Sequence, residues 1–85
     1  MKHKIEYMGE IIAEFKELQD AEHFLDYKRK RILHEMNGEI LDRIAEENNL
    51  DRRYPGTFKN EIVMPYYNKA KEQIKANCKL VSMQG

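Results

Sequence analysis

The sequence predicts a small all-α fold. It comprises four helices in a single domain, 1–85, with a helix-turn-helix outline in the C-terminal half and either a short strand or a frayed tail at the end. Apolar residues recur at the three- to four-residue spacing of amphipathic helices along most of the chain. Only two prolines and four glycines interrupt the 85 residues. A chain of this length buries one modest hydrophobic core, which leaves no room for a second domain.

A first helix is predicted over about residues 4–18. Its apolar stripe has the helical spacing and consists of Ile5, Met8, Ile12, Phe15 and Leu18. Gly9 interrupts the stripe and costs about 1 kcal/mol relative to alanine. Because Glu10 and Glu14 lie outside the stripe, we expect this acidic helix to serve as a packing or partner surface.

A second helix is predicted to begin at Asp20, whose carboxylate can cap the free amides of a first turn. Its apolar set is Phe24, Leu25, Ile32, Leu33 and Met36. Asn37-Gly38 is predicted to end it, since both residue types tolerate the left-handed conformation. A third helix then runs from Glu39 to Asn48-Asn49. No proline or glycine separates the first two helices, so a continuous helix is the alternative there.

Residues 51–56 form the main predicted loop, in which Tyr54-Pro55-Gly56 has the composition of a turn. Thr57 is placed to cap a fourth helix, whose apolar face is Phe58, Ile62, Val63, Tyr67, Ala70 and Ile74. Pro65 removes a backbone donor and should kink or restart this helix. Residues 79–83 are predicted to form either a short strand or a frayed tail.

The residue patterns that enzymes and metal sites require are missing from the sequence. Ser82 is the only serine and Thr57 the only threonine, and neither can be paired with a general base. His23, His34 and Cys78 lack the short paired spacing of zinc ligands. The four glycines are scattered and form no phosphate-binding loop. We therefore expect no enzymatic activity, no cofactor and no metal.

The chain is expected to be a cytoplasmic protein with no contact to a membrane. A membrane-spanning helix needs about 20 consecutive apolar residues, and the longest apolar runs here are Ile11–Ala13 and Ile62–Met64. The basic N-terminus leads into no apolar segment of the signal-peptide type. Cys78 is the only cysteine and cannot form an internal disulfide, which is typical of a reducing compartment.

The net charge of zero is the sum of four opposed blocks. The charges are −4, +4, −5 and +5 over residues 1–26, 27–34, 35–51 and 52–85, respectively. Such segregation can give a neutral protein a basic face. The alternative is that the blocks pair with one another when helices pack antiparallel, so the sequence leaves both arrangements open.

Basic and aromatic residues occur together in the C-terminal half. Tyr54, Tyr66 and Tyr67 lie among Arg52, Arg53, Lys59, Lys69 and Lys71. Tyrosine hydroxyls and cationic side chains both reach nucleic-acid phosphates, and tyrosine and arginine are also enriched at protein interfaces. A third interpretation places Tyr67 in the core and Tyr66 over a helix edge.

Residues 40–80 carry a resemblance to a known family. A short helix containing Ala45 precedes a turn, and a longer helix opens at Thr57 and runs through the phrase FKNEIVMP (58–65). This phrase resembles a segment of the winged-helix plasmid replication initiators, in which a Phe-Lys start, two apolar residues and a proline recur on a DNA-contacting helix. Those initiators are much longer and carry two such domains. The resemblance implies a reduced winged-helix-like DNA-binding module.

The leading hypothesis from the sequence is a small DNA-binding or DNA-associated regulator of the kind that phages and plasmids encode. Phosphate contacts are expected from Arg52, Arg53, Lys59, Lys69 and Lys71, with a second patch at Lys28, Arg29, Lys30 and Arg31. Thr57 and Asn60 would face base edges. The alternative is a helical protein-interaction module, an inhibitor, antitoxin-like partner or adaptor. Tyr54, Tyr66 and Tyr67 are its expected interface residues, and a homodimer is one arrangement it allows.

Overall fold

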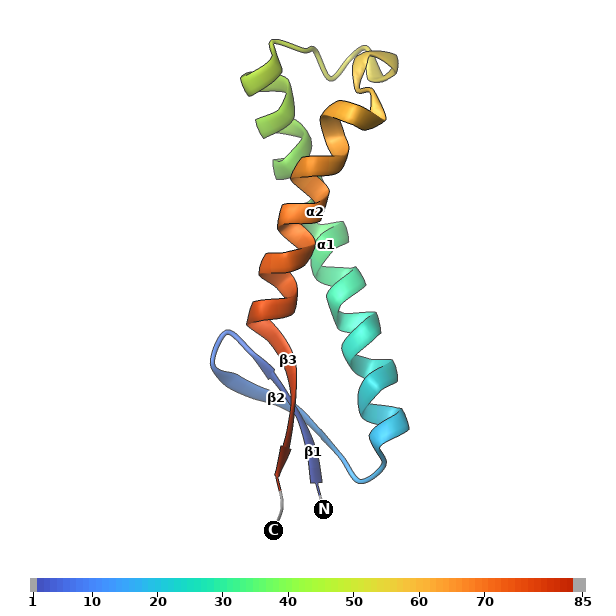
Figure 1. Cartoon of the computed structure of the whole chain (residues 1–85), viewed down its shortest axis with the longest axis vertical. Helices are drawn as coiled ribbons and strands as arrows, with labels where there is room; N and C mark the ends of the chain where they lie inside the picture. The colour runs from blue at the N-terminus through green and yellow to red at the C-terminus, as the bar shows by residue number, and fades with distance from the viewer. Residues whose placement is uncertain (1, 84–85) are drawn as a thin grey trace.

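The computed structural model describes residues 2–83 and shows an α+β fold, in which a small antiparallel sheet carries a long helical hairpin (Figure 1). The elements in order are β1 (Lys2–Tyr7), β2 (Glu10–Phe15), α1 (Leu18–Asn48), a 3-10 turn (Pro55–Thr57), α2 (Asn60–Asn77) and β3 (Cys78–Met83). The prediction of an all-α, four-helix fold was therefore wrong. There are two α-helices and three strands among the described residues.

The segment predicted as the first helix is the β1–β2 hairpin. In β1, His3 and Ile5 are buried, whereas Lys2 is exposed and Lys4 is half-buried, which is the two-residue alternation of a strand with one covered face. Met8 and Gly9 form the turn with φ angles of 54° and 85°. A turn with positive φ at two consecutive residues joins antiparallel strands readily, so the glycine that weakened the helix prediction favours the hairpin.

The strand order in the sheet is β2-β1-β3, with both pairings antiparallel. Ile5 lies at the centre, opposite Ala13 on one side and Leu80 on the other. The register with β2 shifts after Ile5, because Glu6 pairs with Ile11 and Ile12 is left as an extra residue. This bulge leaves the edge strand β2 with two isoleucines exposed, Ile11 at 49% and Ile12 at 40%.

The predicted second and third helices are one continuous helix, α1, of 31 residues. The stop predicted at Asn37-Gly38 was wrong, because packing against α2 carries the helix through it. There the Tyr67 hydroxyl donates a hydrogen bond to the Asn37 side-chain oxygen. The helix begins at Leu18, and Asp20 lies in its first turn rather than at its cap. Its predicted end is confirmed, since Asn49 adopts the left-handed conformation with φ of 58°.

The fourth predicted helix begins at Asn60, two residues later than a cap at Thr57 implies. Thr57 does not cap it: its hydroxyl donates to the Tyr54 carbonyl oxygen at 2.7 Å within the preceding turn. Pro65 lies inside α2, which continues without a break to Asn77. β3 follows directly, so the strand alternative for the C-terminal segment is confirmed. Rather than a helix-turn-helix, the end of α1 and α2 form an antiparallel hairpin (Figure 1).

Two small hydrophobic clusters hold the molecule together. The first joins the sheet to the N-terminal half of α1 and the C-terminal end of α2. It contains Ile5, Ala21, Ile32, Ile74 and Cys78. The second lies between α1 and α2 farther along the hairpin and contains Ile40, Ile44 and Ala70. Leu33 and Met36 pack against both clusters, so they connect the two parts of the core.

The molecule is elongated, with extents of 53 × 20 × 18 Å. Its radius of gyration is 16.4 Å, whereas a compact domain of this length has about 12 Å. Its accessible surface is 6605 Å², against about 5,300 Å² for a compact monomer of the same mass. None of the helices in residues 2–83 is both long and apolar enough to cross a membrane.

Candidate functional site

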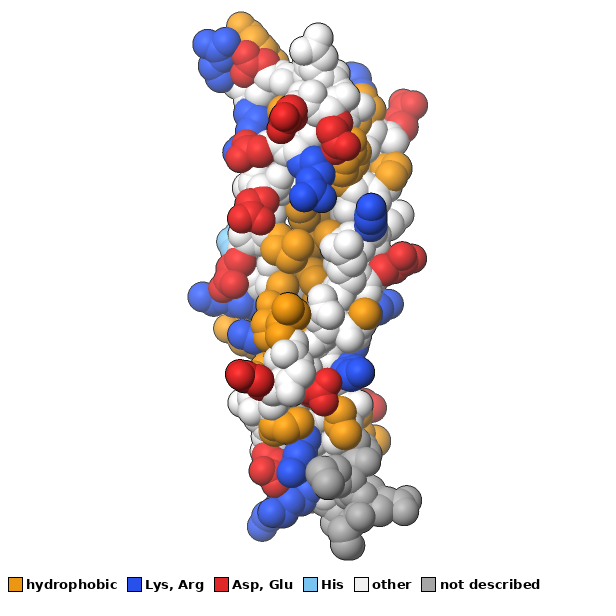
Figure 2. All heavy atoms as spheres, turned by 90° about the vertical axis from the view of Figure 1, so that its left-hand side faces the viewer, with side chains coloured by type: hydrophobic (Ala, Val, Ile, Leu, Met, Phe, Trp, Pro, Cys, Tyr) orange, Lys and Arg blue, Asp and Glu red, His pale blue; other side chains and the backbone are white. Residues whose placement is uncertain are grey.

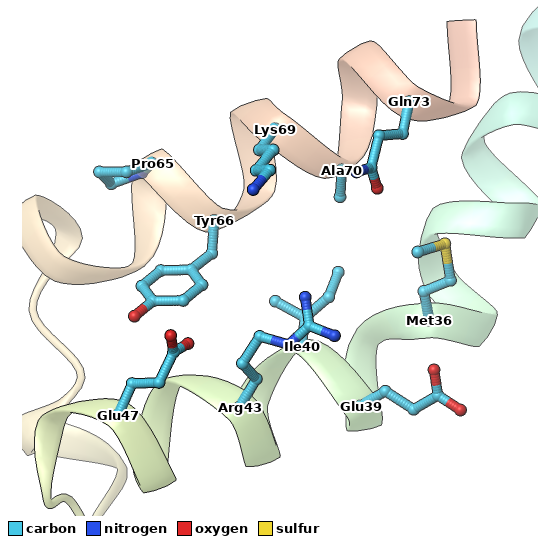
Figure 3. A pocket seen from close by; sticks show the side chains of 10 residues that line it. All are labelled: Met36, Glu39, Ile40, Arg43, Glu47, Pro65, Tyr66, Lys69, Ala70 and Gln73. Carbon is cyan, nitrogen blue, oxygen red and sulfur yellow. The ribbon is translucent and has the colours of Figure 1, made fainter. Parts of the chain in front are cut away.

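A groove of about 280 Å³ lies between the two helices (Figure 3). One wall comes from α1 and the other from α2, and the lining residues are Met36, Glu39, Ile40, Arg43, Glu47, Pro65, Tyr66, Lys69, Ala70 and Gln73. Their positions are 36, 39, 40, 43 and 47 on α1 and 65, 66, 69, 70 and 73 on α2, and this spacing places them on one face of each helix. The groove therefore forms where one face of α1 lies opposite one face of α2.

The base of the groove is apolar and firmly positioned. Ile40 and Ala70 are buried in the second hydrophobic cluster, and Met36 and Tyr66 pack against it. Tyr66 is held at its outer end, where its hydroxyl accepts a hydrogen bond from the Asn48 side-chain amide at 3.1 Å. The same amide donates to the Ile44 carbonyl oxygen at 2.9 Å, which ties the tyrosine to the last turns of α1.

The rim of the groove carries two acidic and two basic side chains, Glu39, Arg43, Glu47 and Lys69, which we call the rim charges. All four are exposed, and within residues 2–83 none of them forms an ion pair. Elsewhere on α1 the same four-residue spacing does form pairs: Lys30 contacts Asp26 at 2.8 Å. Figure 3 shows Arg43 and Lys69 pointing into the groove from opposite walls.

Hydrophobic side chains gather in several groups on one face of the molecule. Figure 2 shows hydrophobic side chains along the middle of the face that lies to the left in Figure 1, with acidic and basic side chains on both sides. Isolated exposed apolar residues are normal on a soluble protein, but apolar side chains that gather on one face with a charged border are typical of an interaction surface.

The arginines predicted to contact phosphates near the end of the hairpin are paired with carboxylates. Arg52 contacts Asp42 at 2.7 Å, and Arg53 contacts Asp51 at 2.7 Å. The hydrogen bond from the Arg53 side chain, reinforced by its backbone amide, holds the pKa of Asp51 below its usual value. Both acids belong to the block 35–51, so the basic and acidic blocks pair here.

The basic cluster of α1 is also largely engaged. Lys30 contacts Asp26, and Arg31 contacts Glu35 at 3.3 Å. Arg29 donates from Nε to the Cys78 carbonyl oxygen at 2.9 Å, and the Lys28 ammonium lies 5.7 Å from the centre of the Tyr7 ring. These contacts tie the cluster to its own helix and to the sheet.

The two predicted basic patches do not merge into one surface. Asp42, which holds Arg52, lies eleven residues beyond Arg31 on α1, about 17 Å along the helix axis. Arg29 and Lys28 contact β3 and β1, respectively, at the opposite end from the loop that carries Arg53. The structure therefore keeps the two patches apart.

The remaining predicted site residues are spread over the hairpin. Lys59 immediately precedes α2, Asn60 begins it, and Lys71 is exposed on it, while Lys69 is the one predicted phosphate-contacting residue in the groove. Of the tyrosines, Tyr54 is 63% exposed, Tyr66 lines the groove, and Tyr67 is half-buried and bonded to Asn37.

The described residues offer neither a metal site nor a reactive thiol. Among residues 2–83, no three histidine, cysteine or acidic side chains lie close enough to hold a metal ion. Cys78 is buried at the start of β3, and this burial raises the pKa of its thiol, which favours the neutral form. A buried neutral thiol is a poor nucleophile.

Sequence reasoning missed most of the groove. Glu39, Arg43 and Glu47 were not singled out, although their spacing of four residues would place them on one side of a helix. The sequence carried no signal that α2 would lie against the same side and turn that face into a wall.

Comparison of the chain with known protein families, with curated proteins and with solved structures finds no match.

Proposed function

We propose that this chain is a protein-interaction module, which binds an apolar helical segment of another polypeptide chain in the groove between α1 and α2. The observation that carries the proposal is the groove itself, with its apolar base and four rim charges that find no ion pair within residues 2–83. Rim charges left without a partner can pair with charged residues on a bound chain, which adds specificity to apolar contacts.

A helix is the kind of segment that fits this surface best. The side-chain ridge of one helix packs into the groove formed by two others, and such binding uses apolar residues spaced three or four apart. The hairpin is two helices side by side, and its groove is lined by Met36, Ile40 and Tyr66. A third helix would cover these side chains and complete a bundle.

The proposal can be tested by panning a displayed library of helical peptides against the dilute protein. Enriched peptides should carry apolar residues at helical spacing flanked by acidic residues near Arg43 and Lys69. Their affinity should fall about tenfold or more for the double variant Arg43→Glu/Lys69→Glu, because two attractions become repulsions. The matched control is Lys59→Glu/Lys71→Glu, which reverses two charges outside the groove. No enrichment, or equal losses in both variants, would contradict the proposal.

DNA binding is the second candidate. Lys59, Lys69 and Lys71 support it, because they are exposed and form no ion pair within residues 2–83. The acids beside Arg52 and Arg53 weaken it, since a paired arginine attracts phosphate less strongly. Fluorescence anisotropy with duplex DNA at low salt distinguishes DNA binding from the protein-interaction function. A DNA-binding protein would bind, and its affinity would fall steeply as salt rises.

A further inference from the structure

We propose that the chain bound in the groove is a second copy of this chain, and that two copies pack groove to groove with their α1 helices antiparallel. This inference rests on the proposed function, because it names the partner of the same groove. Three features of the single chain support it: its excess surface, the composition of its rim charges and their placement on the two helices.

The surface of the single chain exceeds that of a compact monomer by more than one partner's share of a standard dimer interface. The accessible surface of 6605 Å² is about 1,300 Å² larger than expected for its mass. A standard interface buries about 800 Å² on each partner. Packing one long face of the 53 Å molecule against another copy would therefore remove more than half of this excess from each chain.

The rim charges are self-complementary. Glu39, Arg43 and Glu47 follow one another along α1 with alternating sign, and Lys69 faces them from α2. Two positive and two negative groups on one rim sum to zero, so a second copy neither repels the first through net charge nor leaves an excess of either sign. A partner of strongly acidic or strongly basic character would satisfy only half of this rim.

The order of the rim charges selects the antiparallel arrangement. When two α1 helices lie antiparallel with the symmetry axis between two rim charges, Arg43 of each copy lies against Glu39 or Glu47 of the other. A parallel arrangement places α1 of one copy against α2 of the other, and it brings Arg43 toward Lys69. Like charges placed face to face disfavour a complex, so the parallel dimer is disfavoured.

The test is a charge-swap experiment in solution. Light scattering should give the wild-type chain twice its mass of 10.2 kDa. The variant Arg43→Glu/Lys69→Glu has an acidic rim, and the variant Glu39→Lys/Glu47→Lys has a basic rim. Each alone should have the mass of a single chain, because its copies repel. Mixed in equal amounts, the two should recover the doubled mass as a heterodimer.

All four substituted residues are exposed, so each variant is expected to fold, and an unchanged circular dichroism spectrum verifies this. The control Lys59→Glu/Lys71→Glu should retain the doubled mass. A wild-type chain of single mass overturns the self-association proposal, as does a dimer that both swapped variants retain.

These outcomes separate the inference from the proposed function. A chain of single mass that still binds panned peptides through Arg43 and Lys69 is an interaction module with a different partner. A chain of single mass that binds no peptide contradicts both proposals. If each variant is monomeric and the mixture also fails to associate, the substitutions disrupt the dimer but opposite rim charges do not restore it. That result overturns the antiparallel pairing.

Discussion

Two glycines have opposite effects on the stability of the fold, because they occupy different backbone conformations. Gly9 has φ of 85° in the β1–β2 turn, whereas Gly38 lies within α1. A Cβ added at either position meets no atom within 4 Å, so the effect of a substitution is conformational rather than steric. Positive φ strains any residue with a Cβ, while a helix interior favours alanine over glycine.

We therefore expect Gly9→Ala to lower the free energy of unfolding by about 1 kcal/mol, and Gly38→Ala to raise it by about 0.5–1 kcal/mol. Urea denaturation of the two variants beside the wild-type chain measures both changes. Each variant is the control for the other. Stabilisation by Gly9→Ala would contradict the hairpin and favour the helix that the apolar spacing of residues 4–18 predicts.

Asp51 provides a residue-scale prediction on pH. The Arg53 side chain and then its backbone amide lower the pKa of this carboxyl. Because the folded-state pKa lies below that of the unfolded chain, the stabilisation is present above the unfolded-state pKa and is lost as pH falls through the folded-state value. In Arg53→Ala the pKa of Asp51 should rise only part of the way, since the backbone amide remains.

NMR titration of the side-chain carboxyl carbons measures this shift directly. Lys30→Ala is the matched control, because it removes the partner of Asp26 and should raise the pKa of that acid instead. If Arg53→Ala left the titration of Asp51 unchanged, the ion pair would not be the cause of its lowered pKa.

At the scale of elements, the sheet depends on its central strand. Ile5 has no exposed surface and is paired on both sides, whereas Ile11 on the edge strand is 49% exposed. Truncating a buried isoleucine to alanine typically costs about 2–5 kcal/mol through lost apolar contact and the cavity left behind.

We expect Ile5→Ala to lower the free energy of unfolding within that range, and Ile11→Ala to change it by about 0.5 kcal/mol or less. Chemical denaturation of both variants tests the difference. Comparable losses would mean that both isoleucines are buried, which would contradict a sheet with one covered and one open face.

At the scale of the whole molecule, elongation leaves a thin core and a large surface. The first and the second hydrophobic cluster are joined chiefly through Leu33 and Met36, and the groove lies beside the second cluster. Self-association through the groove would extend that cluster across the interface. Its strength would then have an apolar part, which salt leaves in place, and an ionic part from the rim charges.

We expect the proposed dimer to weaken but persist as salt rises, because at about 1 M salt the screening length falls to about 3 Å and exposed ion pairs lose most of their attraction. Sedimentation velocity at rising salt measures the dissociation constant. A tighter dimer at high salt would indicate that the rim charges repel one another, contrary to the antiparallel arrangement.

Several features of this protein could be inferred from its sequence because they depend on local chemistry. The end of α1 at Asn49 and the turn around Pro55 are of this kind. The strand at residues 79–83 is not, because its pairing with β1 decides between the strand and the frayed tail that the sequence leaves open. The sequence also supports the interaction-module alternative, in which Tyr66 is an expected interface residue, and this alternative remains a proposal.

The tertiary structure decided the elements whose local signals were ambiguous. The apolar residues of 4–18 fit a helical stripe, yet Ile5, Ala13 and Phe15 equally fit one face of a hairpin, and pairing of β1 with β3 from the other end of the chain selects the hairpin. Contact with α2 likewise carries α1 through Gly38. The groove belongs to both helices at once, and packing between distant segments is not encoded in either segment alone.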